Sequence, residues 1–177
     1  STLFPYTTLF RSLTRLVEQM LDLAQADALA LDGHVAIDIA DIGRDVVAAM
    51  APKVFAAQRD LRFESFGDTA AIGHPEAIFR IYRNLIDNAL SHAPGVTPID
   101  VSAGPGPQLT VRDYGPGIAE VDLPHVFDRF WRKDRRSSTG AGLGLGIVQR
   151  LTEAHGGTVS VENATGGGAS FRVRLEV

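Results

Sequence analysis

Two asparagines four residues apart are the first side chains in this sequence whose types and spacing could do chemistry. Asn84 and Asn88 fall on one face of a predicted helix from Pro75 to about His92, among apolar neighbours. Amide oxygens on a half-buried helix face can ligate a hard cation or bind a polar ligand. Taken alone, a solvated polar face is the simpler interpretation of this pair.

A carboxylate stands at the end of a predicted strand over 109–113 and is followed closely by two glycines. Asp113 could accept a hydrogen bond from an exocyclic amine, such as that of adenine. Gly115 and Gly117 would let the backbone approach a flat ligand closely. An ordinary turn begun by Asp is the alternative interpretation of the same residues.

Glycines gather again between Gly140 and Gly146, at the start of a helix predicted over 143–155. A glycine-rich helix start leaves backbone N–H groups free to bind phosphate, and the helix dipole favours the negative charge. The spacing matches neither the dinucleotide-binding fingerprint nor the P-loop, and a flexible hinge is the alternative. Each glycine inside a helix lowers helix stability by up to about 1 kcal/mol relative to alanine, so the cluster indicates that these glycines serve a function.

Basic and aromatic side chains are interleaved just before this glycine loop. The cations between Arg129 and Arg136 could form a lid that neutralises phosphate oxygens, pinned to the body by Phe127, Phe130 and Trp131. A solvated charged face is the alternative. No long regular element is predicted over 114–142, and loops of that length are usually functional or mobile.

The elements that must position these residues follow from hydrophobic periodicity and from helix and turn signals. Helices are predicted over 13–31, from Asp38 or Asp41 to about 58, over 75–92 and over 143–155, and strands over 34–37, 61–66, 70–72, 99–103, 109–113, 158–163 and 169–177. Pro52 is expected to kink or break the second of these helices. Because strands and helices mix without regular βαβ alternation, we predict an α+β fold. It is a two-layer α/β sandwich, with helices on one face of a mixed, mostly antiparallel sheet.

Composition bounds the classes of protein to which the chain can belong. The 177 residues suit one domain, or one domain plus a short appendage. The absence of cysteine excludes disulfides, thiolate metal sites and cysteine nucleophiles. The 17 basic and 21 acidic residues give a net charge of −4, so no nucleic-acid partner is expected. No apolar run approaches the ~20 residues of a membrane span, and we expect a cytoplasmic location.

The extreme N-terminus has an unusual sequence. Residues 2–12 read TLFPYTTLFRS and fit neither the helical nor the strand period. This run is identical to the in-frame translation of a common short-read sequencing adapter. We therefore interpret residues 1–12 as an artefactual leader, with a frayed apolar segment as the alternative.

Taken together and in this order, the four motifs resemble the catalytic domain of bacterial sensor histidine kinases, within the wider family of ATPases that share the Bergerat fold. The N box of that family is similar to residues 84–89, the G1 box to 113–118, the F box to 126–132 and the G2 box to 140–145. Residues 153–157 resemble the usual sequence that follows. The resemblance covers residues 13–177.

The resemblance implies roles only for the residues that match. Asn84 and Asn88 would act at the phosphates, with Asn88 holding Mg²⁺, and Asp113 would accept the adenine amine. The other ATP-binding positions that the resemblance implies are Gly115, Gly117, Ile118, Phe130, Arg132, Gly140, Gly142, Leu143, Gly144 and Leu145. The reaction it implies is in-line transfer of the γ-phosphoryl group of ATP to a histidine nitrogen.

Two departures from the family pattern affect these expectations. Ser91 stands where many N boxes carry a basic residue. None of the five histidines lies in the acidic, Thr-Pro-bearing H box, so no phospho-accepting histidine is expected in this chain. Residues 13–33 look like the second helix of the family's dimerisation hairpin, and residues 34–177 like its ATP-binding catalytic domain. The chain would then begin after its own substrate site and would not phosphorylate itself.

The partners implied by the resemblance are ATP, a histidine-bearing dimerisation helix that is missing here and a response regulator. They include a second copy of the parent protein in a homodimer, and the parent is either free or tethered to the inner membrane. Three alternatives stay open: a Bergerat-fold ATP hydrolase, a serine kinase of that fold, and a nucleotide-binding interaction module without turnover. A hydrolase would need a Glu base one helical turn before Asn88, where this sequence has Asn84.

Overall fold

The structure of the protein is a computed structural model, which describes residues 33–93, 95–128 and 143–176. Several predictions therefore lie outside the described residues. They concern the leader and the helix over 13–31, the basic lid with Phe130 and Arg132, and the loop glycines Gly140 and Gly142.

Most predicted elements occur within two residues of their expected bounds. The helices are α2 (Ile39–Ala56), α3 (Pro75–His92) and α4 (Gly144–Ala154), with a short 3-10 helix, η1 (Leu123–His125). The strands are β1 (Val35–Asp38), β2 (Leu61–Ser65), β3 (Ala70–Gly73), β4 (Ile99–Ala103), β5 (Gln108–Arg112), β6 (Thr158–Asn163) and β7 (Ala169–Arg174). The last strand ends earlier than its prediction over 169–177.

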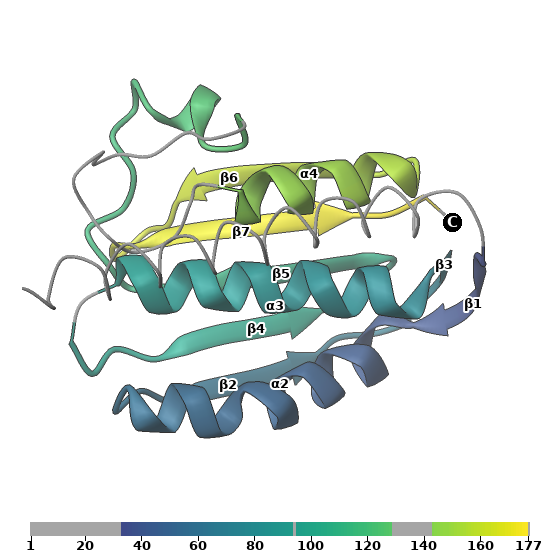
Figure 1. The fold of residues 1–177 in the computed structure, drawn as a ribbon, viewed down its shortest axis with the longest axis horizontal. Helices are drawn as coiled ribbons and strands as arrows, with labels where there is room; N and C mark the ends of the chain where they lie inside the picture. Colours follow the sequence, from purple (N-terminus) through teal and green to yellow (C-terminus); the bar gives the residue numbers. More distant parts are fainter. Residues whose placement is uncertain (1–32, 94, 129–142, 177) are drawn as a thin grey trace, which may run out of the picture.

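The fold is a two-layer sandwich, as predicted. Five strands form one sheet in the order β2-β4-β5-β7-β6, in which only the β2–β4 pairing is parallel. Helices α2, α3 and α4 lie together in front of this sheet (Figure 1), with α2 on β2 and β4, α3 on β4 and β5, and α4 on β6. Strands β1 and β3 pair separately as a small antiparallel sheet, a pairing that the sequence analysis does not include.

The core fills the space between the two layers, and it follows the alternation of the strands. Ile99 and Val101 of β4 and Leu109 and Val111 of β5 are at most 2% exposed, while their neighbours along each strand face the other side. The predicted inner face of α3 meets them with residues that are fully buried. These residues are Ile78, Ile81, Tyr82, Leu85 and Ile86. Strand and helix periodicities therefore point to the same interface.

In helix α2, the predicted break at Pro52 is wrong. Asp38 caps the helix, since its Oδ1 accepts from the backbone N–H of Ala40 at 2.8 Å, but Pro52 neither ends nor breaks it and the helix continues to Ala56. The turn after Pro52 is held by tertiary contacts, because Val54 is 1% exposed and Lys53 forms an ion pair with Asp87 of α3 at 2.6 Å. Packing therefore outweighs the hydrogen bond that proline cannot make.

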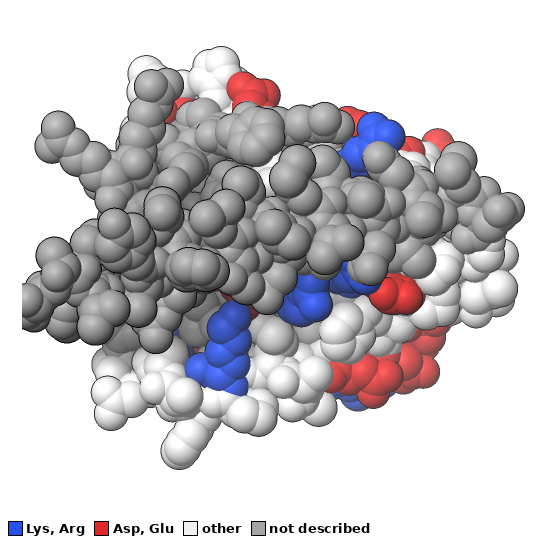
Figure 2. Space-filling model, in the orientation of Figure 1, with Lys and Arg blue, Asp and Glu red and all other residues white. Residues whose placement is uncertain are grey.

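The helix-covered face carries charges of both signs. Lys and Arg lie close to Asp and Glu among the described atoms of this face (Figure 2). Two ion pairs on the helices are Lys53 with Asp87 and Arg80 with Glu76. An exposed pair such as Lys53–Asp87 contributes at most about 1 kcal/mol. Within the described ranges, no helix combines the length and the apolarity that crossing a membrane would need.

Candidate functional site

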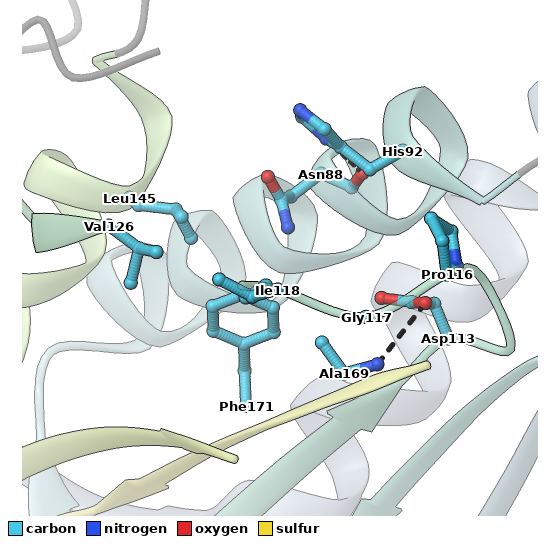
Figure 3. A pocket seen from close by; sticks show the side chains of 10 residues that line it. All are labelled: Asn88, His92, Asp113, Pro116, Gly117, Ile118, Val126, Leu145, Ala169 and Phe171. Carbon is cyan, nitrogen blue, oxygen red and sulfur yellow. Dashed lines mark hydrogen bonds between the residues drawn. The ribbon is translucent and has the colours of Figure 1, made fainter. Parts of the chain in front are cut away.

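One end of the sandwich brings together the ends of four elements that are far apart in the sequence. The C-terminal end of α3, the end of β5, the start of β7 and the start of α4 meet at the left of Figure 1. A pocket of about 130 Å³ lies there (Figure 3). Its lining residues are Asn88, His92, Asp113, Pro116, Gly117, Ile118, Val126, Leu145, Ala169 and Phe171.

Most of the pocket wall is apolar. Ile118, Val126, Leu145 and Phe171 face the cavity (Figure 3), and Phe171 is steadied by an edge-on contact with Phe127 at 6.2 Å between ring centroids. The volume is below the roughly 300–1,000 Å³ of sites that enclose a whole drug-sized ligand. The enclosed space therefore suits a flat heterocycle, with the rest of a larger ligand outside it.

Asp113 is the buried charge of the pocket, with 5% of its surface exposed. Its Oδ1 accepts from the backbone N–H of Gly115 at 2.8 Å and of Ala169 at 3.3 Å. In the part of the chain that the structure describes, both hydrogen bonds to this carboxylate end on Oδ1. The second oxygen, Oδ2, is thus available to a donor on a ligand, such as an exocyclic amine.

The turn between β6 and β7 presses directly against this carboxylate-bearing strand end. Gly168 has a φ of +83°, and a Cβ at that position would lie 1.9 Å from the carbonyl oxygen of Asp113. Only glycine fits so close an approach. Asp113 is therefore enclosed from the β7 side as well as by its own turn.

Of the two asparagines, only Asn88 is among the residues that line the pocket. Asn88 lines the pocket, whereas Asn84 donates from Nδ2 to the carbonyl of Arg80 at 2.9 Å. That bond turns Asn84 Oδ1 toward Gly144, where a Cβ would be 3.4 Å from it. Both asparagines thus present amide groups on the side of α3 that faces the start of α4.

The residues present fit a magnesium ion. Mg²⁺ takes oxygen ligands and is usually bound by one or two protein groups together with substrate phosphates, not by an all-protein cage. Asn88 offers such an oxygen at the pocket. Among the described residues, His, Asp and Glu form no group of three that could hold a metal.

Helix α4 begins beside the asparagines without a side-chain cap. Leu143, its N-cap residue, has an apolar side chain and makes no capping hydrogen bond to the N–H groups of the first turn. Uncapped N–H groups and the positive end of the helix dipole form a site for anions. Leu145, in the same turn, lines the pocket.

Arg59 is a buried residue that sequence reasoning missed. It is 6% exposed, and its guanidinium donates to the carbonyls of Ala89 and Ala93 at the end of α3, at 2.9 and 3.3 Å, and to that of Thr97 at 2.7 Å. Burial lowers the pKa of Arg59, and the negative charge of Asp113 opposes that shift. A lone arginine at the end of a predicted helix carries no sequence signal for this role.

The pocket brings together a subset of the residues singled out from sequence. Asn88, Asp113, Gly117, Ile118 and Leu145 line it. Asn84, Gly115, Leu143 and Gly144 lie next to it without lining it. The lining residues to which the sequence analysis gives no individual role are Pro116, Val126, Ala169 and Phe171. Ala169 and Phe171 look like ordinary strand positions, and only the pairing of β7 with β5 places them beside Asp113.

Comparison with known proteins agrees with this arrangement. Residues 73–177 match the family of histidine kinase-, DNA gyrase B-, and HSP90-like ATPases. Sensor protein QseC of Salmonella typhi is 37% identical over 163 residues, which cover 91% of this chain and 36% of that protein. The signal transduction histidine-protein kinase AfsQ2 of Streptomyces coelicolor is 38% identical over 170 residues, covering 93% of this chain and 31% of that protein.

A solved structure shows the same fold. Full-length ShkA in complex with AMPPNP superposes with a TM-score of 0.73 at 28% identity, over 90% of this chain and 35% of that one. The chain spans about a third of the length of these relatives. With its α/β sandwich and its pocket around Asp113, the chain belongs to the family of histidine kinase-, DNA gyrase B-, and HSP90-like ATPases, and its relatives there are sensor histidine kinases.

Proposed function

We propose that this chain binds ATP with Mg²⁺ and is the catalytic unit that transfers the γ-phosphoryl group to a histidine of a sensor histidine kinase. The observation that carries the proposal is the orientation of Asp113. Two backbone N–H groups hold one carboxylate oxygen, and the other is available at the polar end of an otherwise apolar pocket. An acceptor there selects a base with an exocyclic amine over one that presents a carbonyl oxygen.

Each part of the site has a distinct task in binding ATP. The apolar walls with Ile118 and Phe171 cover the faces of the base and exclude water, while Asp113 orients it. The uncapped start of α4 and the amides of Asn84 and Asn88 receive the phosphates. Asn88 would hold Mg²⁺, which neutralises charge on the phosphates when bound. Phosphoryl transfer rests mostly on such positioning and charge neutralisation.

The structure favours a transferase over a hydrolase of the same fold. A hydrolase needs a carboxylate base that activates water, one turn before Asn88. Asn84 occupies that place, and its amide is hydrogen-bonded to the carbonyl of Arg80. An amide cannot take a proton from water near neutral pH. In the parent protein, the acceptor would be a histidine on a dimerisation helix, the parent would act as a homodimer, and a response regulator would receive the phosphoryl group.

Calorimetric titration of the chain with ATP and with GTP, each with and without Mg²⁺, tests the proposed site. We expect saturable binding of ATP that Mg²⁺ strengthens, and much weaker binding of GTP, because guanine presents a carbonyl oxygen to Asp113. Equal affinity for the two nucleotides would contradict the assignment of this pocket to adenine. If the chain binds ATP but transfers no phosphoryl group to a supplied histidine-bearing helix, the alternative of an interaction module is favoured.

A further inference from the structure

The segment from Asp113 to Ile118 forms one side of the pocket, yet it belongs to neither a helix nor a strand. Such a segment lacks the hydrogen-bond ladder that positions regular elements. Its place must therefore come from side chains and backbone of other elements. Both of its ends are held by the same neighbour, the end of the β6–β7 hairpin that carries the turn.

The first attachment is at Asp113. Its backbone N–H donates to the carbonyl of Ala169 at 3.0 Å, and its Oδ1 accepts from the N–H of Ala169 at 3.3 Å. These bonds extend the pairing of β5 with β7 by one residue. They hold the start of the segment. Its far end, at Ile118, has no strand partner in the described sheet.

The second attachment is made by the side chain of Asn163, the last residue of β6. Its Oδ1 accepts from the backbone N–H of Ile118 at 2.8 Å, and its Nδ2 donates to the carbonyl of Ile118 at 2.8 Å. One amide thus satisfies both backbone groups of one residue, as a neighbouring strand would. Asn163 pairs with Ala169 across the hairpin, so both attachments stand on adjacent hairpin residues.

The residue before Ile118 shows how closely this side chain is fitted. Gly117 has a φ of +75°, and a Cβ there would lie 2.7 Å from Asn163 Oδ1. The amide of Asn163 therefore packs against the backbone of two consecutive residues, both of which line the pocket. Asn163 itself is exposed and is not among the lining residues.

We propose that Asn163 is a positioning residue for the base pocket, acting through Gly117 and Ile118 without touching the ligand. The inference rests on the proposed binding of ATP. Without the two bonds of Asn163, the Ile118 wall is free to move away from the position that closes over the base, and binding must restore it. The role concerns the base alone, because Asn163 contacts the segment beside Asp113 and not the start of α4.

Two substitutions and one control separate positioning from stability. Asn163→Ala removes both hydrogen bonds, and Asn163→Leu removes them while keeping a side chain of similar size. Ser160→Ala is the control, since residue 160 is exposed on the same strand and faces the other side of the sheet. Affinities for adenosine, ADP and ATP are measured by calorimetry, and urea unfolding is followed without ligand.

We expect both Asn163 variants to bind all three ligands about three- to tenfold more weakly, by the same factor for each, because two exposed hydrogen bonds are lost and the base is common to all three. The urea midpoints should stay close to that of the wild type, and Ser160→Ala should match it in both measurements. Hydrogen exchange at the Ile118 amide should be faster in both Asn163 variants.

Several results would overturn the role of Asn163. They are unchanged affinity in both variants, a loss confined to ATP that spares adenosine, or a drop in unfolding free energy that accounts for the whole loss of binding. Failure of the wild-type chain to bind any of the three ligands would instead refute the proposed function, and with it the inference. The two failures are therefore told apart in one experiment.

Discussion

At the scale of single residues, the two carboxylate oxygens of Asp113 differ in their surroundings, and the proposed function gives each a different role. Oδ1 is held by the N–H groups of Gly115 and Ala169, which fixes the plane of the carboxylate before any ligand arrives. In the proposed site, Oδ2 would meet the ligand without reorganisation. Preorganised acceptors of this kind cost little ordering on binding.

Asp113→Asn should therefore weaken ATP binding about ten- to hundredfold, because a hydrogen bond to a charged group contributes roughly 1.5–3 kcal/mol. If the amide keeps its oxygen on the two backbone N–H groups, its own N–H₂ faces the amine of the base, donor against donor. Calorimetry with ATP measures the loss, and Asp45→Asn, on the exposed surface of α2, is the control. ATP affinity like that of the wild type would show that the base binds elsewhere.

At the opposite end of the molecule, His155 is a buried imidazole with a structural role. It is 6% exposed, its Nε2 accepts from the backbone N–H of His74 at 3.0 Å, and its Nδ1 faces the carbonyl of Leu151 at 2.6 Å. The ring of His34 packs edge-on against it at 4.6 Å. Burial is the main cause that lowers the pKa of His155, and the nearby His34 and His74 lower it further.

This lowered pKa predicts a stability that falls with acidification. Below about pH 6.5, the imidazole of the unfolded chain takes up a proton while the buried one resists it. The contribution of His155 is thus complete above pH 6.5 and is lost as the pH falls through its native value. Urea unfolding at pH 7.5 and 5.5 should show lower stability at pH 5.5, with a smaller difference in His155→Gln. An identical pH dependence in the variant would exclude His155 as the cause.

At the scale of elements, helix α2 shows where local rules hold and where packing overrides them. Pro52 lies in its fourth turn and is exposed, whereas Gly43 lies in its second turn and is buried. A Cβ on Gly43 would approach Phe63 Cε2 to 2.5 Å and the hydroxyl of Tyr82 to 3.0 Å. Both residues are poor helix formers, but only at Gly43 do neighbouring side chains leave no room for a Cβ.

Alanine at these two positions should therefore act in opposite directions. Pro52→Ala restores a backbone N–H on an exposed face and should raise the free energy of unfolding by about 1–2 kcal/mol. Gly43→Ala should lower it by about 1–3 kcal/mol despite its better helix propensity, because β2 and α3 must move aside. Urea unfolding of both variants measures the two effects. A stabilised Gly43→Ala variant would show that Phe63 yields at little cost.

The bounds of α3 were predictable from local sequence, and its partners were not. Pro75 at the first turn starts the helix, and its apolar stripe identifies the buried face. Nothing in that stripe says that Arg59, 30 residues before Ala89, caps its end. A capping residue so distant in sequence is decided by the pairing of β2 with β4, which brings the α2–β2 turn to the end of α3.

At the scale of the whole molecule, the site is assembled from both halves of the chain. The N-terminal half supplies Asn88 on α3, and the C-terminal half supplies Ala169 and Phe171 on β7. Between them, β5 lies at the centre of the sheet and ends at Arg112, directly before Asp113. The central position of β5 explains why its end is enclosed on both sides.

None of the five histidines in this sequence lies in an H box, so under the proposed function the chain as given should act on a histidine supplied in another molecule. With radiolabelled ATP, we expect no acid-labile label on the chain alone and label on a supplied dimerisation hairpin from a sensor histidine kinase relative. Asn88→Asp should abolish that transfer, since it changes the predicted magnesium ligand. Acid-labile label on one of the chain's own five histidines would contradict this prediction.

Within the described ranges, sequence alone determined the helices and strands and the residues on their inner faces. Hydrophobic periodicity, proline and glycine act over a few residues, so their effects can be predicted from the local sequence. Tertiary structure decided the contacts that span long separations. Examples are the Asn163–Ile118 bonds, 45 residues apart, and the His74–His155 bond, 81 apart. The Asn163–Ile118 bonds depend on the order β5-β7-β6 in the sheet, which brings the end of β6 beside the segment that follows β5. The His74–His155 bond depends on the packing of α3 against α4.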